Sequence, residues 1–324
     1  MENKEDGELI NISGVSEEIL ETIDAEELKE YNEKLPLQQR KIAISISESE
    51  DLESLGMSEL HLKDSIIEFA RHILVQGGTI VYGGDLRKEG FTEKFSELSF
   101  QYRNKKDSKR FPFINFFAYP IFCNLTPIIE AEYGKNKVEI VKVKPDNSFN
   151  LVESEYQFVP PFPVENAYLW AKCLTKMRVD MNKHIDARVL IGGRNEGFKG
   201  KYAGIVEEAH IALKTNKPTY LIGMFGGATL KIIEAITNKK NVIDSSFTHY
   251  NSLDYKSLKN CFAENNDEES PNIEDLNEYF KGLTWRDLKN GLSEDENKRL
   301  FITNHLLEVI YLVMKGLRNI YKSD

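Results

Sequence analysis

The sequence predicts an α/β fold, a doubly wound and mainly parallel sheet with helical segments added at its amino and carboxyl ends. Two observations support this prediction. Short β-rich runs alternate with longer segments of helical periodicity, and most of the runs are apolar along nearly their whole length. Such strands are typical of parallel sheets buried on both faces, and the alternation is typical of their right-handed crossover connections.

The amino-terminal stretch, residues 1–37, is acidic and polar. Apolar side chains recur in it at loosely helical spacing before Pro36. These apolar residues are Ile19, Leu20, Ile23 and Leu28. We therefore expect residues 1–37 to form an appended helix or a mobile arm that is separate from the sheet.

A strand, a helix and a second strand follow within about forty residues. The run KIAISIS starts at Lys41, residues 61–75 have helical periodicity and are closed by Gly77 and Gly78, and TIVYGG comes next. Two strands joined in this way are parallel neighbours connected by a right-handed crossover. This unit sets the pattern for the rest of the sheet.

The same alternation continues to about Tyr250. The β-rich runs are FPFINFFAYPIF, KVEIVKVK, DARVLIGG and PTYLIG, and the helical segments are AYLWAKCLTKMRVDMNKH and GIVEEAHIALKT. We therefore predict a Rossmann-like domain over residues 38–250. Residues 251–324 form a predicted appendage, in which the polar, glutamate-rich connection ENNDEESPNIED is followed by one helix from Glu294 to Tyr321. The apolar stripe of that helix consists of Leu300, Leu306, Leu307, Ile310 and Met314.

Composition indicates a soluble, cytoplasmic protein. Hydrophobic residues make up 41% and charged residues 29%, and no apolar run is long enough to cross a bilayer, so we expect no membrane association. The start MENKEDGELI lacks the basic and apolar parts of a secretory signal. Cys123, Cys173 and Cys261 are widely spaced, as expected for reduced thiols.

The net charge of −10 disfavours binding to nucleic acid, because the surface as a whole repels the phosphate backbone. A basic cluster is the best feature for a nucleic-acid partner, but we interpret it as a solvated surface loop. It consists of Arg103, Lys105, Lys106, Lys109 and Arg110. A small anionic ligand is compatible with the net charge, because local N–H groups and arginines outweigh distant charges that salt screens.

Glycine pairs follow three of the predicted strands. They are Gly83 with Gly84, Gly192 with Gly193, and Gly226 with Gly227. One pair alone is typical of a tight structural turn. Three pairs at the carboxyl ends of strands in one parallel sheet converge on one edge, where ligands of such folds bind and where glycine lets a phosphate approach the backbone. We therefore expect a shared anion-binding pocket.

Charged and polar residues near these turns complete the predicted ligand site. Asp85 and Arg194 follow the first and second glycine pairs, and a carboxylate there suits ribose hydroxyls while an arginine suits a phosphate. Glu207 and Glu208 lie in the first turn of the helix that begins at Gly204, and one of them is expected to serve only the helix dipole. Ser47, at the end of the first strand, belongs to the same predicted set.

Several common sites are not indicated. The sequence has neither a Walker motif nor a GxGxxG fingerprint, which argues against a nucleotide triphosphatase and a classical dehydrogenase. The six histidines include no pair at i, i+3 or i, i+4, so we expect no metal site. No cofactor is expected. We expect His210 to be packed or on the surface and not to act as a base.

Three segments carry a resemblance to a known family. VYGGDLRKEGF, MRVDMNKHIDARVLIGGR and GIVEEAHIAL, in this order, resemble the SLOG superfamily over about residues 41–237. That superfamily includes LOG cytokinin-activating phosphoribohydrolases, DNA-binding DprA proteins and sensor domains for nucleotide-derived ligands. The segment GGRNEGFKGKYAGIVEEA is similar to the branch found in prokaryotic conflict systems, which implies sensing of nucleotide signals, often derived from NAD, in antiviral defence.

The resemblance also has local departures. Val81–Gly84 match the VYGGG of LOG enzymes, with Asp85 in place of the last glycine. Their PGGxGTxxE signature corresponds to Gly192, Gly193, Gly204 and Glu208, with Ile191 for the proline, Ile205 for the threonine and an insertion over about residues 195–203. Their RKxxM element is approximated, with Met181 on its methionine, Arg178 on its lysine and Met177 on its catalytic arginine.

Three functions follow as alternatives. The first is a sensor that binds ADP-ribose or a related nucleotide on the glycine turns and signals through its terminal segments, as a homo-oligomer or through an effector protein. The second is a nucleoside-monophosphate N-glycosidase in which Glu208 stabilises the ribosyl centre or orients water and Arg178 anchors phosphate. The third, a DprA-like nucleic-acid binder, is disfavoured by the net charge.

Overall fold

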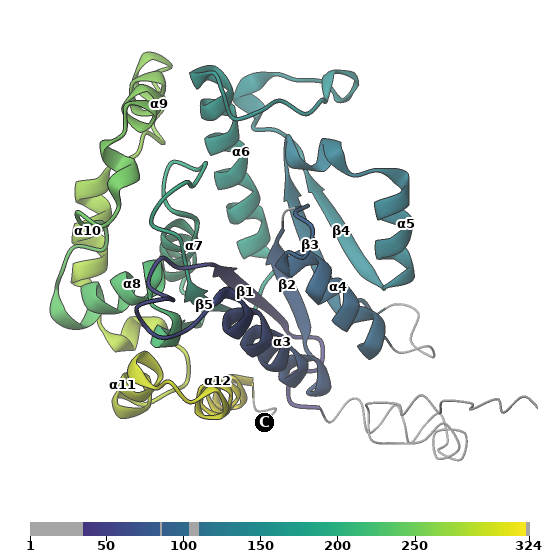
Figure 1. Ribbon diagram of the computed structural model, residues 1–324, viewed down its shortest axis with the longest axis vertical. Helices are drawn as coiled ribbons and strands as arrows, with labels where there is room; N and C mark the ends of the chain where they lie inside the picture. The colour runs from purple at the N-terminus through teal and green to yellow at the C-terminus, as the bar shows by residue number, and fades with distance from the viewer. Residues whose placement is uncertain (1–34, 85, 104–109, 322–324) are drawn as a thin grey trace, which may run out of the picture.

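The computed structural model describes residues 35–84, 86–103 and 110–321, so most of the predicted amino-terminal arm, Asp85 and the lysines of the basic cluster lie outside the described residues. Within these ranges six strands form one sheet in which all neighbouring strands are parallel, in the order β4-β3-β2-β1-β5-β6 (Figure 1). The strands are β1 (Lys41–Ser47), β2 (Thr79–Gly83), β3 (Phe113–Ala118), β4 (Val138–Val143), β5 (Ala187–Gly192) and β6 (Thr219–Ile222). The predicted α/β, doubly wound fold is confirmed.

Ten α-helices lie in the described ranges. They are α3 (Glu59–Val75), α4 (Phe91–Tyr102), α5 (Pro127–Lys135), α6 (Val164–Lys183), α7 (Gly204–Lys214), α8 (Gly227–Asn238), α9 (Leu253–Glu264), α10 (Ile273–Gly282), α11 (Glu294–Ile302) and α12 (Leu306–Tyr321). In Figure 1, α10 lies beside α8 and α12 lies beside α3. None of the helices in this part of the chain has the length and apolar character needed to cross a membrane.

Both faces of the sheet are covered, and β1 shows why. Ile42, Ile44 and Ile46 pack into the cluster that also contains side chains of α3, α4 and α12, whereas Ala43 packs on the opposite face with α6. Side chains of a strand alternate between the two faces, so a strand with buried side chains on both faces needs helices on both sides. The buried residues on both faces of the strand KIAISIS therefore require a helical layer on each side of the sheet.

The order of the strands creates a topological switch point between β1 and β5. The chain adds β2, β3 and β4 on one side of β1 and then crosses to the other side for β5 and β6. At the carboxyl edge Ser47 is the register partner of Gly192. A crevice outside such a switch point is the usual ligand site of doubly wound sheets. The glycine turn after β5 is thus placed beside the loop that leaves β1.

The carboxyl-terminal segment is two helices where the sequence predicts one. Thr303 separates α11 from α12, and its hydroxyl accepts a hydrogen bond from the N–H of His305 at 3.2 Å and donates one to Glu308 at 2.6 Å. Such local side-chain bonds compete with helix continuation. Helix α12 then packs Val309 and Val313 into the same core as the sheet, so this helix covers one face of the sheet.

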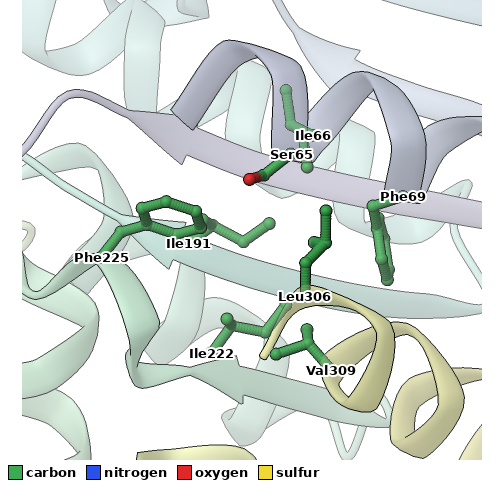
Figure 2. A pocket seen from close by; sticks show the side chains of 8 residues that line it. All are labelled: Ser65, Ile66, Phe69, Ile191, Ile222, Phe225, Leu306 and Val309. Carbon is green, nitrogen blue, oxygen red and sulfur yellow. The ribbon is translucent and has the colours of Figure 1, made fainter. Parts of the chain in front are cut away.

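A small pocket lies under α12, between that helix, α3 and the ends of β5 and β6 (Figure 2). Its lining is apolar except for Ser65, and its volume is about 10 Å³. Space of this size holds one water molecule at most. The pocket therefore reflects imperfect packing of the carboxyl-terminal helix and is not a nucleotide site. It is lined by Ser65, Ile66, Phe69, Ile191, Ile222, Phe225, Leu306 and Val309.

Candidate functional site

The loop that follows β1, residues 48–51, is the centre of the carboxyl edge. We call these residues, Glu48, Ser49, Glu50 and Asp51, the acidic loop. The carboxylate of Glu50 accepts hydrogen bonds from the backbone N–H of Asn195 at 3.1 Å, and that of Asp51 accepts one from the N–H of Gly227 at 2.7 Å. The acidic loop therefore touches the glycine turns after both β5 and β6.

Glu48 extends this contact toward the turn after β2. Its carboxylate pairs with the guanidinium of Arg194 on one side and lies 3.7 Å from that of Arg87 on the other. Arg87 belongs to the loop that begins with Gly84, so segments from three glycine turns meet at one acidic loop. The turns after β5 and β6 therefore meet at the acidic loop, and Arg87 brings the segment after β2 to it, while Asp85 lies outside the described residues.

Close backbone packing explains the glycines after β5 and β6. A Cβ on Gly227 would lie 2.3 Å from the carbonyl oxygen of Gly193, and a Cβ on Gly192 would lie 2.6 Å from that of Ser47. Both glycines also have positive φ, near +62°. Hydrogen bonds from the N–H of Gly193 to Ser47 and from that of Ala228 to Gly193 join the turns to β1.

Gly83 and Gly84 have a different environment. A Cβ on Gly84 would lie 2.2 Å from Oδ1 of Asn115, a fully buried residue of β3, and 2.5 Å from the hydroxyl of Thr92 in α4. Gly83 faces Met177 of α6. These two glycines allow close packing of β2 against β3 and α4, and they are less directly joined to the acidic loop than the other two pairs.

The N–H groups of the site are accordingly engaged by the chain's own carboxylates. Asp51 stands at the amino terminus of α8, where the unpaired N–H groups of a helix favour an anion. Ser47 also contributes, since its hydroxyl accepts a hydrogen bond from the N–H of Arg194 at 3.2 Å. Two buried oxygens next to these groups in sequence, Oδ1 of Asn195 and Oγ1 of Thr229, have no hydrogen-bond partner among the described residues. Both side chains are buried, Asn195 at 5% and Thr229 at 0% exposure.

A second set of charged residues lies beneath α7. We call Arg178, Arg188, Glu207 and Glu208 the buried ion cluster. Glu208 accepts a hydrogen bond from Arg188 at 2.5 Å and one from the hydroxyl of Ser45, and its other oxygen lies 3.6 Å from Nε of Arg178. Glu207 pairs with Arg178. Each carboxylate is thus neutralised by at least one arginine.

Burial governs the electrostatics of the buried ion cluster. Arg188 has no exposed surface, and this burial lowers the pKa of its guanidinium, while the adjacent Glu208 opposes that change. Sequence reasoning missed Arg188. The only signal was an arginine as second residue of the otherwise apolar strand ARVLIG. A charge in such a strand requires a buried partner, which proves to be Glu208.

A comparison with known families identifies the fold. The family model described as SLOG cluster2 matches residues 36–300 of the chain. The chain belongs to the SLOG cluster2 family. Membership in this family indicates a nucleotide-related binding domain. Searches of the curated proteins and of the solved structures returned no match.

Within this SLOG cluster2 domain, Arg178, which corresponds to the LOG lysine, is buried, and so is Glu207, the residue before the one that corresponds to the signature glutamate. Arg178 is 8% exposed, and its guanidinium passes close to the backbone of Gly200 and Gly204, where a Cβ would lie 2.9 and 3.0 Å from its Nη atoms. Glu207 is 2% exposed and also accepts a hydrogen bond from Thr175 at 2.5 Å. Gly204 therefore serves the approach of Arg178 to the start of α7.

The insertion over residues 195–203 is held by aromatic residues. The hydroxyl of Tyr250 accepts a hydrogen bond from the N–H of Ala203 at 3.0 Å, and that of Tyr255 donates one to the carbonyl of Lys201 at 2.7 Å. The ring of Phe198 lies 5.1 Å from that of Tyr250. Burial raises the pKa of both tyrosines, so they remain neutral donors and acceptors. The insertion is thus packed against the segment that contains Tyr250 and Tyr255.

His210 and the described residues of the basic cluster make contacts within their own chain. The ring of His210, which was expected to be packed or on the surface, lies 4.7 Å from that of Tyr279, and burial lowers its pKa to about 4. The described members of the basic cluster contact their own chain: Arg110 donates to the carbonyl of Gly78 at 3.0 Å, and Arg103 lies over the ring of Phe100.

Within the described ranges no three His, Cys, Asp or Glu side chains are grouped to hold a metal ion.

Proposed function

We propose that this domain binds a nucleotide-derived ligand of the ADP-ribose type at the switch point and acts as a sensor in a prokaryotic defence or signalling system. Its phosphates accept hydrogen bonds from the backbone N–H groups of Asn195 and Gly227, and the guanidinium of Arg194 lies beside them. Its ribose hydroxyls donate hydrogen bonds to a carboxylate of the surrounding loops. Gly83 and Gly84 border the same edge, and Asp85, the next residue in the sequence, belongs to the proposed ligand set.

One observation carries this proposal. Carboxylates of Glu50 and Asp51 already occupy N–H groups of two separate glycine turns, at 3.1 and 2.7 Å. A phosphate uses the same donors as a carboxylate and brings more negative charge to a helix amino terminus. The acidic loop thus marks the places where two anionic groups fit. Asn195 and Thr229 supply buried oxygens without partners for ligand hydroxyls.

Displacement of the acidic loop supports a sensor in particular. A phosphate on Gly227 and Asn195 must replace Asp51 and Glu50, which also frees Glu48 from Arg87 and Arg194. Binding is therefore coupled to a rearrangement of the loop between β1 and α3, and α3 packs against α12. We propose that the rearrangement is passed on by self-association of the domain or by contact with an effector protein.

The geometry gives less support to the N-glycosidase alternative. The carboxylate of Glu208 is engaged by Arg188 and Ser45, and Arg178 is engaged by Glu207. Arg178 is 8% exposed, and the side chain of Glu208 is 13% exposed. A group that stabilises a ribosyl cation or anchors a phosphate must reach the substrate. The buried ion cluster is better suited to fixing α7 on the sheet.

A ligand screen with a turnover control separates the two functions. The full chain is incubated with AMP, NAD and ADP-ribose, while its melting temperature is followed by fluorimetry and free base by chromatography. A ligand that binds only the folded state raises the melting temperature. We expect ADP-ribose to raise it without release of base. Release of base that stops in Glu208→Gln would instead establish the hydrolase.

A variant of the acidic loop tests the displacement. Asp51→Ala removes the carboxylate on Gly227, so we expect the unliganded protein to lose about 1 kcal/mol of stability and to bind ADP-ribose about five-fold more tightly. Calorimetric titration measures the affinity. Glu53→Gln, an exposed carboxylate in the same connection, is the matched control and should change neither. Lost stability with unchanged or weaker affinity would show that Asp51 does not compete with the ligand.

A further inference from the structure

Helix α12 has an exposed apolar stripe on the side opposite the sheet. Leu307 is 73% and Tyr311 61% exposed, and Ile302 at the end of α11 is 82% exposed. Leu307 and Tyr311 are four residues apart and so lie on one face of the helix. A groove of about 260 Å³ continues this stripe and is lined by Tyr311, Lys315, Arg318 and Asn319. We call Leu307, Tyr311, Lys315 and Arg318 the α12 stripe.

The described chain contacts the end of this helix five residues after it begins. The guanidinium of Arg40 lies 4.4 Å from the ring centroid of Tyr321, the last residue of α12. Both residues also meet Asp186, through an ion pair of 3.5 Å and a hydrogen bond of 2.8 Å from the tyrosine hydroxyl to its carbonyl. Leu37 is fully buried, which fixes the chain at this point. Leu35 lies against Gly77, just past the end of α3, so residues 1–34 join the described chain five residues before its contact with Tyr321.

The charge of residues 1–34 is opposite to that of the groove. These residues contain twelve acidic and three basic side chains, which accounts for most of the net charge of −10. The groove presents Lys315 and Arg318 around the ring of Tyr311. Oppositely charged surfaces attract, and acidic side chains with an apolar edge suit a groove that is both basic and aromatic. The apolar edge is supplied by Ile19, Leu20, Ile23 and Leu28.

We propose that residues 17–30 bind to the α12 stripe of their own chain. The lengths are comparable: Tyr321 and Tyr311 are ten residues apart on a helix, about 15 Å, and the residues between Glu30 and Leu35 span up to about 17 Å when extended, with Leu35 five residues before the Arg40 that contacts Tyr321. The apolar side chains of the segment cover Leu307 and Tyr311, and its carboxylates face Lys315 and Arg318.

Zero-length carbodiimide cross-linking of the full chain tests this proposal. The reagent joins carboxylates to Lys315, and its link to Glu296, which already pairs with Lys315, is an internal control. We expect links between Lys315 and Glu17, Glu18, Glu21, Asp24, Glu26, Glu27 or Glu30. Tyr311→Glu should reduce them at least five-fold and keep the Glu296 link. Ile128→Glu, on α5 and 80% exposed, should leave both unchanged.

An isotope mixture identifies the chain that supplies the segment. Cross-linking an equal mixture of ¹⁵N-labelled and unlabelled protein gives links within one isotope if the segment binds its own chain. Links of mixed isotope would assign the α12 stripe to contacts between two copies and overturn the proposal. Loss of only the Glu296 link in Tyr311→Glu, or absence of links to residues 17–30 in the unchanged protein, would also overturn it. No ligand enters this experiment, so its outcome is independent of the proposed nucleotide site.

Discussion

At the residue scale, the buried ion cluster is the feature with the greatest energetic consequence. Arg188 and Glu208 are removed from water, and their attraction must offset a desolvation cost of several kcal/mol for each ion. Ser45 adds a hydrogen bond from β1. The pair therefore ties β1, β5 and α7 together in one arrangement, directly below the glycine turns. A displaced α7 would leave a charge without its partner.

The first prediction concerns this pair. Arg188→Met leaves Glu208 without its main partner in a buried place, so we expect a loss of about 3–5 kcal/mol in the free energy of unfolding. Glu208→Gln in the same chain should restore part of that loss, because no uncompensated charge remains. Denaturant unfolding of the two single variants and the double variant gives the coupling. Additive losses would show that the two side chains do not stabilise each other.

The second prediction concerns pH. The pKa of His210 is lowered to about 4 in the folded state, below its usual value near 6.5. Between these values the unfolded chain binds a proton that the folded chain does not, so stability falls as pH falls from 6.5 to 4, by about 2 kcal/mol for this residue. His210→Gln should lose this share of the pH dependence in urea unfolding at pH 7 and pH 5. An unchanged dependence would rule out His210 as its source.

Individual site residues could be predicted from the sequence only where their pattern has a single structural explanation. Gly192, Gly193, Gly226 and Gly227 were found because glycine pairs at strand ends are unusual. Arg188 was not found, because the partner that permits a charge in an apolar strand is distant in sequence and becomes a neighbour only after folding. The expectation that one of Glu207 and Glu208 is structural is compatible with the cluster, in which both are paired with arginines.

At the element scale, the strands and the main crossover helices could be predicted from the sequence. The break between α11 and α12 could not. A short apolar run such as ARVLIG is typical of a buried strand, so β5 and its neighbours were predicted correctly. The stop between α11 and α12 was missed because it depends on the hydroxyl of Thr303 bonding to Glu308 and His305, and the helical spacing of apolar residues continues across it. Periodicity alone does not detect such a break.

The third prediction tests the packing of the turns. Gly227→Ala places a Cβ 2.3 Å from the carbonyl oxygen of Gly193 at a φ of +62°, so we expect a loss of about 3 kcal/mol or more in stability. Gly197→Ala is the matched control, since Gly197 has a φ of +63° but no atom within 4 Å of the added Cβ. It should lose only about 1 kcal/mol, the cost of the conformation. Equal losses would mean that the contact with Gly193 is unimportant.

At the scale of the whole molecule, the sheet order brings distant segments to one edge. Glu48, Glu50 and Asp51 contact residues that lie far away in the sequence, in the turns after β2, β5 and β6. The sequence predicted that these turns meet, because the carboxyl ends of parallel strands share an edge. It did not predict that the acidic loop fills the N–H groups, because the orientation of that loop depends on all three turns at once.

Backbone amide NMR tests the central claim, a nucleotide-binding edge at the switch point, most directly. ADP-ribose is titrated into ¹⁵N-labelled full chain, and the amide signals of Asn195 and Gly227 are followed. These amides exchange a carboxylate acceptor for a phosphate if the account is correct, so we expect both signals to shift with one saturation curve, together with those of Glu50 and Asp51. Saturable binding that leaves Asn195 and Gly227 unchanged, or no binding at millimolar ADP-ribose, would contradict it.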